Sequence, residues 1–232
     1  MFEKEHSLRE KIDLTLTRFG EVEWGVCDYP ADIGLPQLYE KVLIVAVPFL
    51  WTLKLKDYRE PVFKHLQTAS FERNGRIAAA LKDLFRAEGI RHGEPEHSTA
   101  EQFELRMNEG FNTKECCRLA GLGWIGKSNL FVSFRYGPQV NMIAFFVDAP
   151  LTGGTPVTES RCGNCRNCVD NCPARVIKGI TWAPGVTRDE QVDYAACSKP
   201  RLKTYEHLGR KITCARCVIA CPRGWKHNRE PI

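Results

Sequence analysis

The sequence lacks any stretch that would carry the chain into or across a membrane. Its longest apolar run, from Val42 to Trp51, is about half as long as a spanning helix must be. The first fourteen residues mix charges of both signs and contain no apolar segment of the kind that signal peptides have. We therefore expect a cytoplasmic protein with no membrane partner.

Repeats, low-complexity tracts and an excess of one charge are also missing. The chain has 33 basic and 28 acidic residues, and its net charge of +5 permits an acidic partner without indicating one. With 232 residues, of which 43% are hydrophobic, it is long enough for one large or two modest globular domains. Composition alone does not indicate an activity.

Cysteine is the residue that the sequence has in excess. Eleven cysteines are present, and eight of them fall between positions 162 and 221. Because thiols stay reduced in the cytoplasm, this number favours metal binding over disulfides. The block CGNCRNCVDNCP has the spacing C-x2-C-x2-C-x3-C-P of bacterial ferredoxins, in which the first three thiolates bind one 4Fe–4S cluster and the fourth binds the other. A second block, CARCVIACP, ends in the same C-x3-C-P signature.

This crossing rule assigns the eight cysteines to two clusters. The first cluster is predicted to take Cys162, Cys165, Cys168 and Cys221, and the second Cys172, Cys197, Cys214 and Cys217. Two zinc sites are the alternative, because C-x2-C pairs also suit tetrahedral zinc. The other three cysteines, Cys27, Cys116 and Cys117, are expected to be small buried hydrophobic side chains.

The glycine-rich segment AGLGWIGKSN, residues 120–129, matches two phosphate-binding patterns at once, G-x-G-x-x-G and G-x-x-x-x-G-K-S. Both patterns need a strand before the loop and a helix after it. Here the helix-like stretch NTKECCRLA precedes the loop and the strand-like stretch NLFVSF follows it, which disfavours NAD and ATP. Tight packing and the close approach of a large ligand both remain open as reasons for the glycines.

The part of the chain before the cysteines is predicted to be α/β. Residues 42–50, VLIVAVPFL, indicate a buried strand, and helical periodicity lies between residues 57 and 88. Asn112, three residues before Glu115, predicts the start of a short helix that ends before Gly121. Residues 130–134 and 142–147 are predicted strands, which we expect to form a hairpin.

Together, these stretches resemble the epoxyqueuosine reductases and their relatives, the cobalamin- and iron–sulfur-dependent reductases that include reductive dehalogenases. AGLGWIGKSN is similar to the glycine loop of that family. VTESRCGNCRNCVDNCPARVI is similar to its first cysteine block, and CARCVIACPRGW is similar to its second. The resemblance runs from about Lys114 to Trp225 and is weak before that.

The resemblance implies an α+β fold with two domains. A nitroreductase-like, cobalamin-binding α/β domain, residues 1–155, would precede a bacterial ferredoxin-like domain with two 4Fe–4S clusters, residues 156–232. The turn-rich stretch APLTGGTP, residues 149–156, predicts the same boundary from composition. The resemblance also implies a cobalamin bound base-off beside the glycine loop. The residues predicted to contact it are Gly121, Leu122, Gly123, Trp124, Gly126 and Lys127.

The implied function is that of an oxidoreductase. Electrons would pass from a low-potential donor, such as a ferredoxin or flavodoxin, through the two clusters to cobalamin and then to a small or unidentified substrate. One alternative is an electron-transfer protein, or a reductive activator of another corrinoid protein, with no substrate of its own. Another is a trimmed epoxyqueuosine reductase that acts on tRNA.

Two departures from the family count against tRNA as the substrate. Met107 stands where the family carries a catalytic Asp, and a methionine cannot supply the proton, whose delivery is typically worth ~10²–10⁴-fold in rate. Glu109 and Tyr136 are weaker candidates, so the catalytic residue is unassigned. The family also usually continues into helical repeats that help to hold tRNA, whereas this sequence stops at Ile232. We therefore expect inefficient reduction of epoxyqueuosine.

Overall fold

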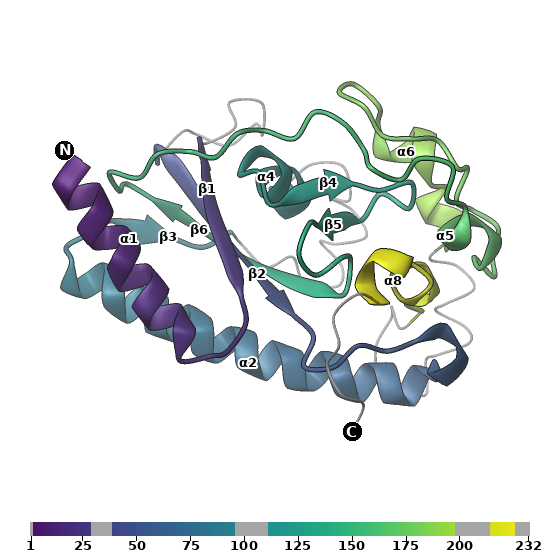
Figure 1. The fold of residues 1–232 in the computed structure, drawn as a ribbon, viewed down its shortest axis with the longest axis horizontal. Helices are drawn as coiled ribbons and strands as arrows, with labels where there is room; N and C mark the ends of the chain where they lie inside the picture. The colour runs from purple at the N-terminus through teal and green to yellow at the C-terminus, as the bar shows by residue number, and fades with distance from the viewer. Residues whose placement is uncertain (1, 29–38, 96–110, 198–213, 226–232) are drawn as a thin grey trace. The chain divides into compact units, whose positions relative to one another are not determined.

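The chain forms two compact units that interleave along the sequence. The computed structural model describes residues 2–28, 39–95, 111–197 and 214–225 (Figure 1). Unit 1 comprises residues 1–47, 71–122 and 141–156, and unit 2 comprises residues 48–70, 123–140 and 157–232. The chain crosses from unit 1 to unit 2 for the last time after Pro156, beside the predicted domain boundary. The prediction of two consecutive domains does not include the earlier crossings of the chain between the units.

Unit 1 is built around a four-stranded sheet with the order β1-β2-β6-β3. The elements that lie wholly or largely in it are α1 (Phe2–Thr17), β1 (Glu23–Asp28), β2 (Lys41–Pro48), α2 (Glu60–Ala87), β3 (His92–Gly93), α4 (Thr113–Leu119) and β6 (Val140–Val147). Strand β1 runs antiparallel to β2, and β3 runs antiparallel to β6. The predicted strand at residues 42–50 and the predicted helix between residues 57 and 88 are confirmed as β2 and α2. The mixed α/β class is confirmed as well.

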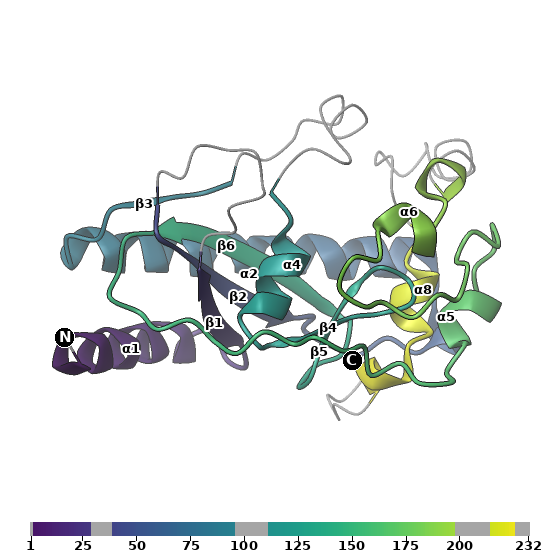
Figure 2. The ribbon, with the colours of Figure 1, turned by 90° about the horizontal axis from the view of Figure 1, so that it is seen from above.

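Helices cover both faces of the sheet in unit 1. The odd-numbered residues of β2 between positions 43 and 47 share one core with apolar residues of α1 and α2. Gly25 of β1 pairs with Ile44 and therefore faces the other side, where a Cβ would lie 3.2 Å from the Ala120 side chain after α4. Figure 2 shows the same strands with α1, α2 and α4 from a second direction. Burial on both faces explains why β2 is a continuous apolar run instead of an alternating one.

The predicted cap of the short helix is present in α4. The Asn112 side chain accepts a hydrogen bond from the backbone N–H of Glu115 at 3.3 Å, which satisfies one of the free donors at the helix start. After the helix, Gly121 has a φ of 78°, the left-handed conformation that glycine adopts without strain. The helix therefore begins and ends where its sequence signals predict.

The predicted hairpin of residues 130–134 and 142–147 is wrong. Strand β5 (Phe131–Ser133) pairs antiparallel with β4 (Gly123–Ile125), while β6 joins the four-stranded sheet. A Cβ on Gly123 would lie 2.1 Å from the carbonyl oxygen of Val132, so the missing side chain lets β4 approach β5 closely. Periodicity predicts a strand, but it does not identify the partner of that strand.

Unit 2 consists of short elements joined by turns. Its elements are η1 (Leu55–Asp57), the start of α2, β4, β5, α5 (Asn167–Asp170), α6 (Arg188–Gln191), α8 (Arg216–Ile219) and η3 (Pro222–Trp225). Tyr58 and Phe63 share an apolar core with Ala215 and Ile219, so the early segment at residues 48–70 packs with the second cysteine block. No helix in the described ranges combines the length and apolar character needed to cross a membrane.

Candidate metal centre

Four cysteines from the two blocks lie near one another in unit 2. Burial raises the pKa of Cys221 to about 11; the nearby thiols of Cys162, Cys168 and Cys165 contribute to the rise, and a hydrogen bond involving the backbone of Arg223 opposes it. Burial also raises the pKa of Cys168, and Cys162 and Cys165 add to that effect. The structure thus brings together the four cysteines predicted to bind the first cluster, although Cys221 belongs to a different block from the other three.

The chemistry of this donor set fits an iron–sulfur cluster. Thiols whose ionised forms repel one another need a cation to stabilise them as thiolates, and a 4Fe–4S cluster is bound by four such thiolates. Within the described ranges, no three His, Cys, Asp or Glu side chains are arranged to hold a single metal ion. A 4Fe–4S cluster makes a different demand, because its four thiolates bind different irons.

Three of the four cysteines predicted for the second cluster share an apolar environment. Cys172, Cys197 and Cys217, together with Cys168, pack against the buried side chains of Val176, Ile177 and Val192. The fourth, Cys214, is half-buried and stands two residues before α8. Low solvent exposure of this kind is one of the factors that set the reduction potential of a cluster.

Lys127, a residue of the glycine segment, binds the backbone of the first cysteine block. Its side chain is buried, and its Nζ donates hydrogen bonds to the backbone oxygens of Gly163 at 2.7 Å and Cys165 at 3.1 Å. Lys127 was predicted to contact cobalamin. In the structure its ammonium is engaged by the loop that carries two of the predicted cluster ligands.

Gln191 makes a second link between the glycine segment and the region between the two cysteine blocks. It is fully buried, and its Nε2 donates to the backbone oxygens of Gly126 at 3.1 Å and Ile180 at 2.9 Å. Its Oε1 accepts a hydrogen bond from the side-chain amide of Asn129 at 2.8 Å. Each polar atom of this buried amide therefore has a partner, as a low-dielectric site requires.

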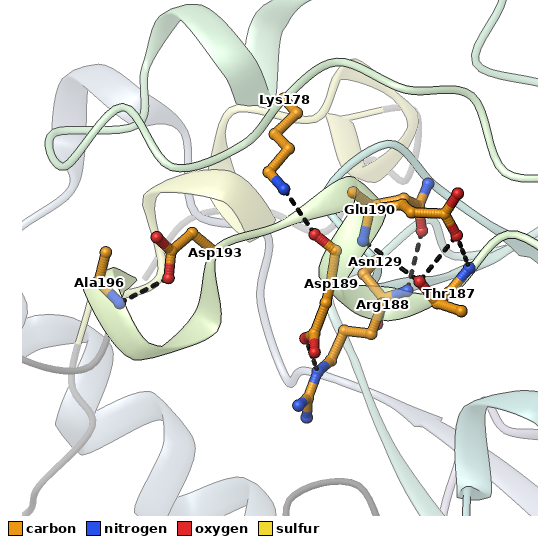
Figure 3. A network of polar contacts seen from close by, with 9 residues as sticks. Asn129, Lys178, Thr187, Arg188, Asp189, Glu190, Asp193 and Ala196 are labelled. Atoms are coloured by element: carbon orange, nitrogen blue, oxygen red, sulfur yellow. Dashed lines mark hydrogen bonds and ion pairs between the residues drawn. The ribbon is translucent and has the colours of Figure 1, made fainter.

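The short helix α6, which contains Gln191, has a complete capping box. The Thr187 hydroxyl accepts from the backbone N–H of Glu190, and the Glu190 carboxylate accepts from the backbone N–H of Thr187 (Figure 3). The hydrogen bond from the Thr187 backbone, followed by that from its hydroxyl, lowers the pKa of Glu190. On the exposed side, the Lys178 ammonium donates to the backbone oxygen of Asp189 at 2.7 Å. A four-residue helix depends on such local bonds for its position.

Two residues far from the cysteines in sequence position the second block. The Tyr58 hydroxyl accepts a hydrogen bond from the backbone N–H of Ala215 at 2.9 Å. Gly137 has a φ of 65°, and a Cβ there would lie 2.5 Å from the backbone nitrogen of Gly224 in η3. Sequence reasoning missed both roles. The dipeptide before Pro138 marks a turn, but nothing in it indicates the segment against which the turn packs.

The glycines of the loop are explained by packing within the chain. A Cβ on Gly121 would lie 2.8 Å from the carbonyl oxygen of Thr155, and one on Gly123 would meet the backbone of β5. A Cβ on Gly126 would lie 3.1 Å from Val132 and 3.6 Å from the Cys162 sulfur. Of the two explanations left open, tight packing is therefore the one supported by contacts.

Two further residues predicted to contact cobalamin are Leu122 and Trp124. Leu122 is half-buried, and Trp124 is buried with an Nε1 that has no hydrogen-bond partner among the described residues. Tyr136 is buried, whereas Met107 and Glu109 lie outside the described residues.

The three cysteines that are not assigned to a cluster are buried, as predicted. Cys27 lies on β1, and Cys116 and Cys117 lie on α4. A hydrogen bond with Cys27, together with burial, raises the pKa of Cys116, so the thiol resists ionisation. These cysteines are separate in character from the partly exposed cysteines of the two blocks.

Comparison with known proteins places these features in context. No protein-family model matches the chain. The epoxyqueuosine reductase of Pseudomonas aeruginosa is 36% identical over 121 residues, which is 51% of this chain and 32% of that protein. The epoxyqueuosine reductase of Alicycliphilus denitrificans is 24% identical over 252 residues, which is 95% of this chain and 66% of that protein. The resemblance to epoxyqueuosine reductases is confirmed. The chain nevertheless spans less than a third of the first curated relative it matches, 29% of its length.

Solved structures show the same relationship at the level of the fold. A crystal structure of epoxyqueuosine reductase with an epoxyqueuosine-modified tRNA stem loop has a TM-score of 0.58 and 14% identity, covering 95% of this chain and 66% of that one. A reductive dehalogenase described for B12-dependent dehalogenation has a TM-score of 0.64 and 18% identity, covering 95% of this chain and 32% of that one. At this identity, the likeness shows that the chain has the mixed α/β fold of these reductases.

Proposed function

We propose that this chain is an iron–sulfur oxidoreductase that binds two 4Fe–4S clusters and passes their electrons to a cobalamin. The observation that carries the proposal is the position of Cys221 beside Cys162, Cys165 and Cys168. In a two-cluster ferredoxin arrangement, the last cysteine of one block completes the cluster of the other. A chain with two independent metal sites, one for each block, would have no reason to bring Cys221 there.

The relatives support the redox assignment. The curated relatives are named as reductases, and the solved neighbours include a reductive dehalogenase described as B12-dependent. When bound, cobalamin would supply a cobalt centre that exchanges electrons with the substrate. Support for cobalamin comes from these relatives and not from the glycine segment, whose glycines at 121 and 123 lie against other parts of the backbone.

The chain's own residues would bind and position the clusters. Burial of Cys221 and Cys168, and the apolar contacts of Cys172, would limit the access of water to the iron. A low-potential donor such as ferredoxin or flavodoxin would deliver the electrons. The substrate that receives the electrons would be a small or unidentified molecule. The tRNA stem loop bound by one solved neighbour makes tRNA a candidate to test.

Metal analysis of the anaerobically reconstituted chain tests the cluster assignment. We expect about eight irons and eight acid-labile sulfides per chain, as two 4Fe–4S clusters require. Cys221→Ser should lose about half of the iron. Cys117→Ala changes a cysteine of unit 1 that is also outside any disulfide but is fully buried. This variant should keep all of the iron. Stoichiometric zinc without iron in the reconstituted protein would contradict the proposal.

A second experiment tests the cobalamin. The reconstituted chain is mixed with cobalamin and passed through gel filtration, and the visible spectrum of the protein fraction is recorded. Retained cobalamin supports the reductase, and its complete loss with both clusters present would leave an electron carrier. Gly123→Val is unsuitable for this test, because its side chain would break the contact between β4 and β5 whether or not a ligand binds there.

A further inference from the structure

Lys127 is the one charged side chain that is buried among the described residues of unit 2. It stands two residues after the end of β4, and 7% of it is exposed. Its ammonium contacts the backbone oxygens of Gly163 and Cys165. Among the described residues, no carboxylate pairs with it. The positive charge therefore lies against the backbone of the first cysteine block, and its partners among the described residues are neutral.

A buried cation with neutral partners costs free energy unless an anion lies nearby. Carbonyl dipoles offset part of that cost. The thiolates of the first block supply the rest of the compensation when a cluster is bound, since a 4Fe–4S cluster with four thiolates has a net negative charge. That charge increases by one electron on reduction. A fixed positive charge beside the cluster therefore stabilises the reduced form more than the oxidised form.

We propose that the Lys127 ammonium raises the reduction potential of the cluster held by Cys162, Cys165, Cys168 and Cys221, and so eases its reduction by the external donor. This inference rests on the proposed function, because it requires the cluster. One electron enters the cluster from the low-potential donor and one leaves it for the acceptor. Lys127 itself gains and loses no electron. It is a positioning residue that acts through the field it exerts and through the two carbonyl groups it holds.

The cysteines predicted for the second cluster have no equivalent buried lysine among the described residues. Three of them, Cys172, Cys197 and Cys217, pack against buried apolar side chains, and the nearby Lys178 is exposed to solvent, which screens its charge. Lys178 also donates to a backbone oxygen, that of Asp189. It therefore matches Lys127 in chemistry and differs in burial, which makes it the control.

An EPR-monitored redox titration of the reconstituted full chain tests the proposal. The relevant cluster is the one whose signal disappears in Cys221→Ser. In Lys127→Gln, we expect its potential to fall, so that at a fixed solution potential the ratio of reduced to oxidised cluster falls about tenfold, or about 59 mV for one electron. Lys127→Arg, which keeps the charge, should stay close to the wild type, and Lys178→Gln should leave both potentials unchanged.

The outcomes separate this inference from the proposed function. A wild-type chain that binds no iron–sulfur cluster would overturn both. A full iron content with an unchanged potential in Lys127→Gln would overturn the inference alone. Should Lys127→Gln lose its iron, Lys127→Met offers a second neutral side chain of similar length. Iron loss in both neutral variants, with retention in Lys127→Arg, would show that the ammonium only anchors the loop, and would also overturn the inference.

Discussion

Gly137→Ala tests whether the turn after β5 positions the last cluster cysteine. Gly137 has a φ of 65°, and the left-handed conformation costs a residue with a side chain about 1–2 kcal/mol. The new Cβ would also lie 2.5 Å from the backbone nitrogen of Gly224, which cannot move without shifting η3. Overpacking of this kind costs about 1–3 kcal/mol more. We therefore expect a total loss of about 2–5 kcal/mol.

Gly89→Ala is the matched control. Gly89 has a φ of 66°, and a Cβ there would meet nothing within 4 Å. This variant bears the same conformational cost of about 1–2 kcal/mol and no clash. The difference between the two variants isolates the contact with η3.

Thermal unfolding and iron content of the reconstituted variants provide the measurement. For a chain of this length, about 1 kcal/mol shifts the Tm by roughly 2–4 °C, so Gly137→Ala should melt about 2–12 °C below Gly89→Ala. Because η3 directly follows Cys221, Gly137→Ala should also lose about half of its iron, and Gly89→Ala should lose none. Equal melting temperatures and equal iron contents in the two variants would refute the reasoning.

Three further outcomes are expected. Gln191→Leu should destabilise the chain by about 1–3 kcal/mol in denaturant unfolding, because it removes the hydrogen bonds that this buried amide makes with the Gly126 and Ile180 oxygens and with the Asn129 side chain; unchanged stability would contradict this. Because the pKa of Glu190 is lowered, its contribution to stability is present above its unfolded pKa and is lost as pH falls through its folded pKa. Thr187→Val removes the hydroxyl that contributes to this lowering, so the loss of stability at acid pH should be smaller in this variant, as measured by pH-dependent unfolding. Removing the iron with a chelator should lower the Tm, because the clusters bind the folded state only, and an unaltered Tm would exclude a structural role for them.

Much of the local structure could be predicted from the sequence. The run VLIVAVPFL predicts β2, and the Asn112 cap predicts α4, because these signals act within a few residues of the element. The pairing of β5 could not be predicted, since it depends on the close approach of β4 at Gly123. Interleaving of the two units also gives no local signal. Segments 48–70 and 123–140 join unit 2 through contacts with residues far along the chain, such as those of Tyr58 with Ala215 and of Lys127 with Gly163.

The candidate site, too, could be predicted where the signal is local and not where it depends on distant parts of the chain. Cysteine spacing predicts which residues bind metal and which cysteines group together, because the ligand chemistry fixes the spacing. The glycine segment was harder to interpret. Gly126 has a pattern typical of a ligand loop, but in the structure its Cβ would lie 3.1 Å from the Val132 side chain, tighter than an ordinary contact. A glycine pattern indicates that something approaches the backbone, without distinguishing a cofactor from another part of the protein.

The residues that position the cysteines have no motif of their own. The Tyr58 hydroxyl holds the backbone of Ala215, Lys127 holds the loop before Cys165, and Gly137 accommodates η3. All three precede residue 156, so a ferredoxin-like domain limited to residues 156–232 would lack them. The eight cysteines therefore predict what can be bound, while earlier segments help to determine where the thiols stand. In unit 2, the predicted cluster ligands depend on these earlier residues for their position, and a cysteine pattern alone does not make a cluster-binding domain.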